Sequence, residues 1–285
     1  MTLILGGTGR VGREAVKLLS VVGLHQVRLV SRCPNQVPAF FGRRIQIVTG
    51  DIGDSAFLRA AMRGVERVLV IPPNVRNQAV MERGIYRAAL SADVNHVVKL
   101  STVKADVTSP CWFFKQHAIA ERHLRHSGLN FTILRANSFM QNLLWFAHEI
   151  RTRGTFSLPL DDAKTAPVDT RDIAAVAVAV LCNPTSNDFT YNVTGPEKLS
   201  FAEIARKLSA AIGRTVTYRD VPSTDFLKVL IQSGMPTWQA RAATAAWIAA
   251  RNGKPHVTNV VAQLTQRRPI TFDQFACYYA NSFRH

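Results

Sequence analysis

Three glycines at regular spacing follow the first apolar run of the chain, in Gly6-Gly7-Thr8-Gly9-Arg10-Val11-Gly12. Leu3-Ile4-Leu5 before them indicates a buried strand, and the apolar spacing after them indicates a helix. In such a turn Gly6 allows the tight bend, Gly9 lets a pyrophosphate approach the backbone, and Gly12 lets the helix pack on the strand. These residues therefore predict a dinucleotide site at the start of a βαβ unit.

The next expected strand, Gln26 to Val30, ends in Ser31-Arg32, where NAD-selective sites place a carboxylate. An arginine can donate two hydrogen bonds to a 2′-phosphate, which a carboxylate would repel. This position therefore favours NADP(H) over NAD(H), and Arg10 is a second candidate cation. The alternative is that Arg32 is only a solvated loop residue.

Apolar runs alternate with helical patterns through the first half of the chain, as a parallel sheet of βαβ units requires. Six strands are expected in doubly wound order, which is an α/β, extended Rossmann fold. The loops that follow the strands are the remaining candidates for cofactor contacts. The candidate residues in these loops and at the start of the following helix are Asp51, Ile52, Pro72, Pro73, Asn74, Ser101 and Lys115.

The regular alternation of apolar runs and helical patterns ends near residue 150, and a smaller C-terminal α/β substrate lobe is expected beyond it. We assign residues 1–153 to the NADP(H)-binding Rossmann domain, with 165–195 returning to it, and 154–164 and 196–285 to the lobe. Thr170-Arg171-Asp172 is expected to supply an N-cap and an acidic first turn for a helix over Ile173 to Leu181, with Asp172 assigned to capping. Ser200 is expected to cap a helix over Phe201 to Ile212.

Composition narrows the function classes. The net charge is +16, but the basic residues are scattered, with Arg43-Arg44 and Arg267-Arg268 as the adjacent arginine pairs. No nucleic-acid-binding motif accompanies them, so anionic cofactors and substrates are the expected partners, with no specific nucleic acid. The four cysteines are far apart, so neither a zinc site nor a disulfide framework is expected. No apolar run is long enough for a membrane span or leader, which predicts a cytoplasmic protein without membrane contact.

Taken together, motifs along nearly the whole chain resemble the NmrA-like branch of the atypical short-chain dehydrogenases/reductases. They include the glycine turn, Ser31-Arg32, Gly50-Asp51, His96-Val97-Val98-Lys99-Leu100-Ser101, His117-Ala118-Ile119-Ala120-Glu121, Ser127-Gly128-Leu129-Asn130-Phe131-Thr132-Ile133-Leu134-Arg135, Asp169-Thr170-Arg171-Asp172-Ile173-Ala174, Tyr191-Asn192-Val193 and Thr271-Phe272-Asp273-Gln274-Phe275. The resemblance implies NADP(H) as cofactor in an extended Rossmann fold. Members of that family reduce quinones, azo dyes, triphenylmethane dyes or ergot-alkaloid imines, and some are regulators that bind the cofactor without turnover.

The sequence departs from ordinary short-chain dehydrogenases because it has no Tyr-x-x-x-Lys. Quinones, azo groups and iminium ions accept hydride with less protonation by the protein than carbonyls need. Ser101, Lys115 and His117 are the candidate catalytic residues, with His117 as a proton donor near neutral pH. The alternatives are a turn cap for Ser101, a solvated Lys115, and a His117–Glu121 side-chain pair without metal.

Aromatic residues cluster around the same strand ends, and they favour a flat conjugated substrate. The predicted substrate-binding residues are Trp112, Phe113, Asn137, Phe139 and Met140. Two functions remain open: an NADPH-dependent reductase of a quinone-, azo- or imine-like acceptor, and an NADP(H)-sensing regulator that acts through a protein partner. A homodimer is compatible with both.

Overall fold

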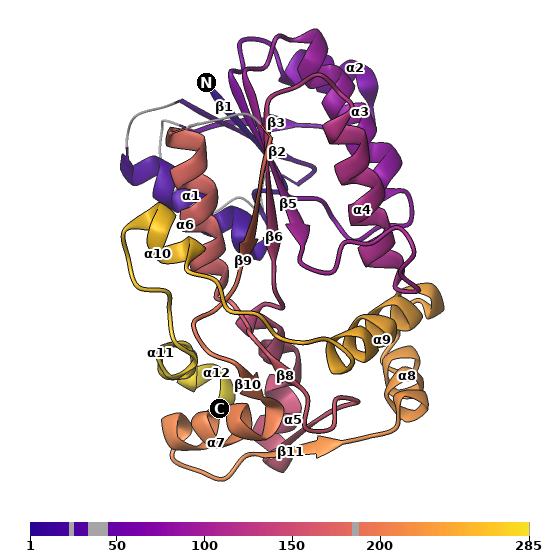
Figure 1. Cartoon of the computed structure of the whole chain (residues 1–285), viewed down its shortest axis with the longest axis vertical. Coiled ribbons are helices and arrows are strands. Elements are labelled where there is room, and N and C mark those ends of the chain that lie inside the picture. Colours follow the sequence, from indigo (N-terminus) through magenta and orange to yellow (C-terminus); the bar gives the residue numbers. More distant parts are fainter. Residues whose placement is uncertain (23–25, 34–44, 184–187, 285) are drawn as a thin grey trace.

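The computed structural model describes residues 1–22, 26–33, 45–183 and 188–284. A sheet with helices on both faces forms one end of the elongated molecule, and a lobe of helices and short strands forms the other (Figure 1). Arg43 and Arg44 lie outside the described residues.

The sheet has seven parallel strands in the order β3-β2-β1-β4-β5-β6-β9. The first six follow the order of a doubly wound dinucleotide-binding fold, which confirms the predicted fold class. The seventh strand, β9, comes from the second half of the chain and pairs with β6. The strands are β1 (Thr2–Leu5), β2 (Val27–Ser31), β3 (Ile45–Thr49), β4 (Arg67–Val70), β5 (His96–Thr102), β6 (Phe131–Ala136) and β9 (Phe189–Val193).

Helices cover both faces of this sheet (Figure 1). Successive residues of a strand point to opposite faces, so Leu3 and Leu5 pack in one buried cluster and Ile4 in another. Because both faces are covered, the central strands are mostly apolar, whereas the edge strands β3 and β9 are largely exposed or half-buried. One layer contains α2 (Ser55–Ala61), α3 (Gln78–Ser91) and α4 (Trp112–Arg125), and the other contains α1 (Arg10–Val22), α6 (Thr170–Cys182) and α10 (Val260–Thr265).

The second lobe has its own apolar core, in which rings of Phe156, Phe201 and Phe275 are buried. Ser200 caps α7 as predicted, through a reciprocal pair of hydrogen bonds with Glu203. The boundaries of the two domains stay a prediction, but Met140, Leu143 and Ile150, which it assigns to the Rossmann domain, pack in the core of the lobe. The elements of the lobe are η3 (Met140–Phe146), α5 (Ala147–Arg153), β7 (Thr155–Leu158), β8 (Lys164–Thr165), β10 (Leu199–Ser200), α7 (Phe201–Ile212), β11 (Thr217–Asp220), α8 (Ser223–Gln232), α9 (Thr237–Arg251), α11 (Phe272–Tyr278) and α12 (Ala280–Arg284).

The prediction that Asp172 caps its helix was wrong, because α6 begins at Thr170 and Asp169 is the N-cap. Asp169 accepts a hydrogen bond from the N–H of Arg171, whereas Asp172 accepts one from the N–H of Ile270 at 2.7 Å. Burial, and to a lesser degree the charge of Asp169, raises the pKa of Asp172 to about 6. The carboxyl of Asp172 therefore joins α6 to the segment that leads into α11.

Two further features concern the whole described chain. Within the described ranges, no helix is both long enough and apolar enough to cross a membrane. Over the same residues, no group of three or more His, Cys, Asp or Glu side chains could hold a metal ion. Cys33, Cys111, Cys182 and Cys277 are all free thiols.

Candidate active site

Strand register brings the predicted cofactor residues to one edge of the sheet. Leu5, the last residue of β1, lies opposite Val30 of β2 and Val70 of β4, and Val70 lies opposite Lys99 of β5. Because the strands are parallel, the loops that follow them meet at their carboxyl ends. This edge gathers residues 6–12, Ser31-Arg32, residues 71–74 and Ser101, with Asp51-Ile52 after the neighbouring β3.

Backbone contacts explain two of the three spaced glycines. Gly6 has a φ of 84°, and a Cβ there would overlap with the carbonyl oxygen of Ile71. A Cβ on Gly12 would lie 2.5 Å from the Cα of Gly7, so only glycine lets α1 pack this closely on the turn. A Cβ added to Gly9 would have one neighbouring atom within 4 Å, the carbonyl oxygen of Gly6, at 3.3 Å. The turn is therefore most crowded behind Gly6 and Gly12 and less crowded at Gly9, beside the start of α1.

The polar residues at the ends of β2 and β3 differ in whether their side chains already form hydrogen bonds within the protein. Arg32 is exposed at the end of β2. The Ser31 hydroxyl donates to the carbonyl oxygen of Cys33 at 3.0 Å, and Asp51 accepts from the N–H of Gly53 at 2.8 Å. Of these three residues, Arg32 alone offers an exposed cation at the edge.

Arg10 connects the glycine turn with the second lobe. Its Nη1 donates to the carbonyl oxygen of Gln141 in η3 at 2.8 Å, and its guanidinium carbon lies 5.5 Å from the centre of the Trp145 ring. Burial lowers the pKa of Arg10 from its usual value. The first residue of α1 thus lies directly against the element that begins the lobe.

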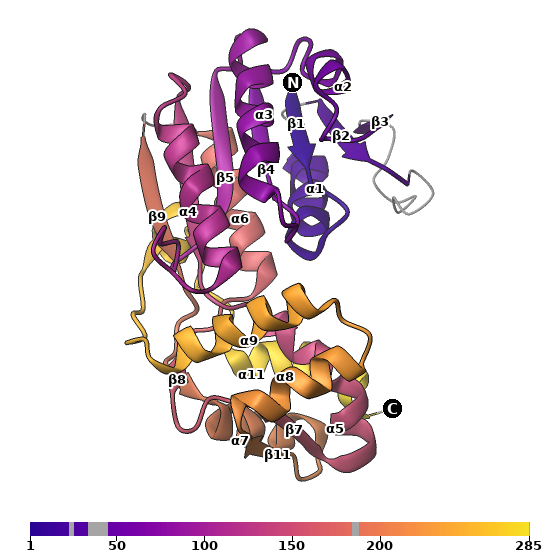
Figure 2. The ribbon, with the colours of Figure 1, turned by 90° about the vertical axis from the view of Figure 1, so that its right-hand side faces the viewer.

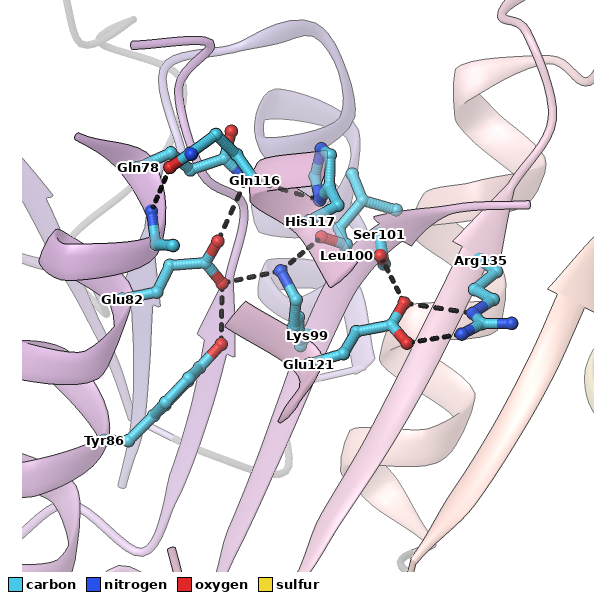
Figure 3. A network of polar contacts seen from close by, with 11 residues as sticks. Gln78, Glu82, Tyr86, Lys99, Leu100, Ser101, Gln116, His117, Glu121 and Arg135 are labelled. Atoms are coloured by element: carbon cyan, nitrogen blue, oxygen red, sulfur yellow. Dashed lines mark hydrogen bonds and ion pairs between the residues drawn. The ribbon is translucent and has the colours of Figure 1, made fainter. Parts of the chain in front are cut away.

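Ser101 and Glu121 belong to one buried polar cluster with Arg135 (Figure 3). Ser101 Oγ donates to Glu121 Oε1 at 2.6 Å, and Arg135 binds both carboxylate oxygens at 3.0 and 2.6 Å. The expected pair between His117 and Glu121 was wrong, because Glu121 faces β5 and β6 instead. Lys115 is exposed in the first turn of α4.

His117 contacts a different buried cluster, on the α3 side of α4 (Figure 3). Its Nδ1 lies 3.3 Å from Gln78 Nε2, which also donates to Glu82 Oε1 at 3.0 Å. With Gln78 as donor, Nδ1 accepts and the ring proton resides on Nε2. Burial, followed by the positive charge of Lys99, holds the pKa of His117 well below its usual value. His117 therefore offers a neutral ring N–H near pH 7 rather than the proton of an imidazolium.

Lys99 and Glu82 form the centre of this second cluster, and both side chains are fully buried. Lys99 Nζ and the Tyr86 hydroxyl each lie 2.6 Å from Glu82 Oε2. The cluster connects α3, β5 and, through Gln78, α4. Lys99 precedes Ser101 by two residues in β5, so the cluster lies next to the carboxyl end of that strand.

The predicted substrate-binding residues separate into two groups. Phe139 and Met140 line a cavity of about 20 Å³, which rings from the second lobe close, among them Trp247. Phe113 instead packs edge-on against Trp238 of α9, with ring centres 6.3 Å apart, and Trp112 is exposed. Besides Phe139, Met140 and Trp247, the cavity is lined by Ser138, Asn142, Leu143, Phe146, Leu158, Pro167, Phe201, Ile204 and Phe272.

Asn137, the fifth predicted substrate-binding residue, lies in the chain between β6 and the residues that line this cavity. Its backbone N–H donates to the carbonyl oxygen of Val193, and its side-chain oxygen accepts from the N–H of Ser138 at 2.7 Å. Asn137 therefore shapes the chain that leads from β6 to Phe139 and Met140.

The model of the NmrA-like family matches residues 1–266 of this sequence. The chain belongs to the NmrA-like family. An NAD(P)H azoreductase of Xenophilus azovorans is 36% identical over 284 residues, 99% of each chain. Quinone oxidoreductase 2 of Escherichia coli (strain K12) is 30% identical over 238 residues, 83% of each chain. Among solved structures, the NADPH complex of an Escherichia coli NADPH-dependent quinone oxidoreductase matches with a TM-score of 0.88, at 26% identity and over 98% and 99% of the two chains.

In this NmrA-like protein, the clusters around Glu82 and Glu121 and the contacts of Arg10 were missed by sequence reasoning. The sequence did contain an indication of the cluster around Glu82, because Lys99 interrupts the otherwise apolar strand Val97 to Leu100. A lysine in a buried strand requires a buried partner. Nothing local identifies that partner as Glu82, which lies 17 residues earlier.

Proposed function

We propose that this protein is an NADPH-dependent reductase that transfers hydride to a flat, conjugated acceptor of the quinone, azo or imine kind. It is an oxidoreductase of the NmrA-like type that uses NADP(H). The contact between Arg10 and Gln141 carries the proposal, because it joins the glycine turn, which is the proposed cofactor site, to η3. Met140 of η3 and the preceding Phe139 line the aromatic cavity. The azoreductase and quinone oxidoreductase relatives support this acceptor class.

The chain's own groups suit a bound dinucleotide phosphate. The glycine turn and the backbone N–H groups of the first turn of α1 suit the pyrophosphate. Arg32 suits a 2′-phosphate, because its guanidinium can donate two parallel hydrogen bonds to it. This arrangement favours NADPH over NADH.

The acceptor is proposed to bind at the cavity beside Phe139 and Met140. About 20 Å³ has room for one water molecule, so the rings that line it must separate to admit a flat acceptor. Phe139 and Met140 approach from β6 and η3, and Trp247 approaches from α9 of the second lobe. Movement of α9 is therefore proposed to open the site.

When bound, NADPH supplies the hydride. The chain has no tyrosine in the place of a short-chain dehydrogenase acid, so the proposed acceptors are ones whose reduction needs little protonation by the protein. His117 Nε2–H is the proposed hydrogen-bond donor to the reduced acceptor, and solvent supplies the one proton that, together with the hydride, completes a hydroquinone or hydrazine product. Ser101 is proposed to position α4 through Glu121, because its hydroxyl donates to that carboxylate.

The decisive experiment is NADPH oxidation by the purified protein against quinones, azo dyes and cyclic imines, with NADH in parallel. The proposal expects saturable turnover of at least one class, with a higher kcat/KM for NADPH than for NADH. Tight NADPH binding without turnover of any class would contradict the proposal and support a cofactor-sensing regulator.

Arg32→Glu is expected to weaken NADPH binding about 10- to 100-fold while leaving NADH binding nearly unchanged, since only NADPH carries the 2′-phosphate. Fluorescence titration with each cofactor measures both affinities. Arg206→Glu, at an exposed position of α7 in the second lobe, is the matched charge control. Equal losses for the two cofactors would remove Arg32 from the 2′-phosphate site.

His117→Ala is expected to lower kcat about tenfold or more, because a ring N–H donor is lost, without abolishing NADPH binding. Since the pKa of His117 is held well below its usual value, the ring stays neutral as pH falls through 6.5. Wild-type kcat should therefore show no His117 ionisation near that pH. The control is His126→Ala, at the exposed end of the same helix. An unchanged kcat in His117→Ala would assign the residue a structural role.

A further inference from the structure

A second hollow is lined by none of the residues assigned to cofactor and acceptor, although its wall residue Glu121 bonds to Ser101. This α4 groove, of about 710 Å³, is bounded by the loop after β5, one face of α4, Arg135 of β6 and Ala249 of α9. Figure 2 shows α4 and the loop that leads into it above α9. None of the groove's lining residues belongs to the glycine turn or to the cavity beside Phe139. The groove therefore needs an explanation of its own.

Cations outnumber carboxylates on the walls of the α4 groove. Lys104, Arg122, Arg125 and Arg135 line it, against Asp106 and Glu121. Glu121 is buried and already receives hydrogen bonds from Ser101 and two from Arg135. Its charge is therefore compensated within the wall, and the groove presents a positive field to solvent.

Two of these cations keep hydrogen-bond donors for a ligand. Arg122 is exposed, and its guanidinium has no hydrogen-bond or ion-pair partner among the described residues. Arg125 is also exposed; its Nη2 donates to the Thr190 hydroxyl at 2.7 Å and lies 3.9 Å from Glu121 Oε2, which leaves its other nitrogens for a ligand. Three residues apart on a helix, the two side chains lie on one face. Lys104 is already bonded to the carbonyl oxygen of Ala249, so it contributes charge but not its full donor set.

Apolar side chains also line the groove, from the loop after β5 and from the same face of α4. Val103, Phe114 and Ala118 line it and are partly buried, and Val107 adds an exposed apolar side chain. Inorganic anions would use the arginines and leave this surface unoccupied. An apolar body attached to the anion would cover it and gain from its burial.

We propose that the α4 groove is a binding site for an amphipathic organic anion. Its carboxylate, sulfonate or phosphate would accept hydrogen bonds from Arg122 and Arg125, and its apolar body would lie against Phe114 and Ala118. The site is separate from the proposed acceptor cavity, and its occupation requires no hydride transfer. Arg122 contributes most to specificity, because its guanidinium is the one without a competing acceptor among the described lining residues.

Calorimetric titration with naphthalene-2-sulfonate and with its neutral sulfonamide tests the proposal. The full-length protein is first saturated with NADP⁺, so that phosphate sites in the cofactor cleft are filled. We expect one saturable sulfonate site, with affinity about tenfold above that of the sulfonamide and falling with added salt. Arg122→Gln and Arg125→Gln should each weaken the sulfonate by about fivefold to tenfold.

Arg87→Gln, an exposed arginine on neighbouring α3, is the matched control and should bind the sulfonate like wild type. Unchanged NADP⁺ affinity and Tm in the Arg122 variant would show that its fold is intact. Equal sulfonate affinity in wild type and Arg122→Gln, or equal affinity for sulfonate and sulfonamide, would overturn the proposal. The titration measures binding without turnover. The measured sulfonate affinities would therefore test this site even if the protein showed no reductase activity.

Discussion

Gly12→Ala is expected to remove most of the NADPH affinity of this protein. The added methyl would lie 2.5 Å from the Cα of Gly7 and would overlap with the carbonyl oxygen of Gly6. Both are backbone atoms, so no side-chain rotation relieves the overlap, and α1 must shift away from the turn. Such overpacking costs about 1–3 kcal/mol. Because the N–H groups at the start of α1 then no longer converge on the pyrophosphate, we expect roughly 10- to 100-fold weaker NADPH binding by fluorescence titration.

Gly84→Ala provides the matched control for this substitution. Gly84 lies within α3, and a Cβ added there meets nothing within 4 Å. Alanine in a helix is favoured over glycine by about 1 kcal/mol, so this variant should bind NADPH normally and unfold at a slightly higher temperature. Wild-type NADPH affinity in Gly12→Ala would show that the turn is not where the pyrophosphate binds.

Glu82→Leu is expected to give the largest loss of stability of any variant considered. The ammonium group of Lys99 would remain buried without the carboxylate that now lies 2.6 Å away. The Tyr86 hydroxyl and the Gln78 amide would lose an acceptor at the same time. Breaking a buried ion pair from one side costs about 3–5 kcal/mol. Urea unfolding measures the difference in the free energy of unfolding.

The double variant Glu82→Leu/Lys99→Met separates an unpaired charge from a merely altered core. Since it removes both charges, it should recover most of the stability that Glu82→Leu loses. Recovery requires that the buried charge causes the loss. Equal instability of the single and double variants would instead assign the loss to packing or to the hydrogen bonds of Tyr86 and Gln78.

Local patterns were sufficient to predict the nucleotide-binding half of the fold. Leu3-Ile4-Leu5 followed by spaced glycines specifies a strand, a turn and a helix within about a dozen residues, and the same alternation predicts the following strands. Membership of the NmrA-like family, and with it NADP(H), was also predicted and is confirmed.

Side-chain partners were far harder to predict, as Ser101, His117 and Glu121 illustrate. The spacing of His117 and Glu121 on one helix suggested that they pair with each other. In the structure they turn to different neighbours: Glu121 to β5 and β6, and His117 to Gln78 of α3. Helical spacing permits a contact between two side chains, but the packing of adjacent elements decides whether that contact forms.

The sequence by itself determined the order of strands and helices, the glycine turn and the arginine that follows β2, because each depends on residues close together in the chain. Only the tertiary structure decided that Lys99 meets Glu82, that Arg10 reaches Gln141, and that Arg122 and Arg125 line a groove together with the loop after β5. Those contacts join residues on different elements, in one case 131 positions apart. Hydrophobic periodicity specifies which face of an element is buried, whereas burial and charge on neighbouring elements select the partner of each polar side chain.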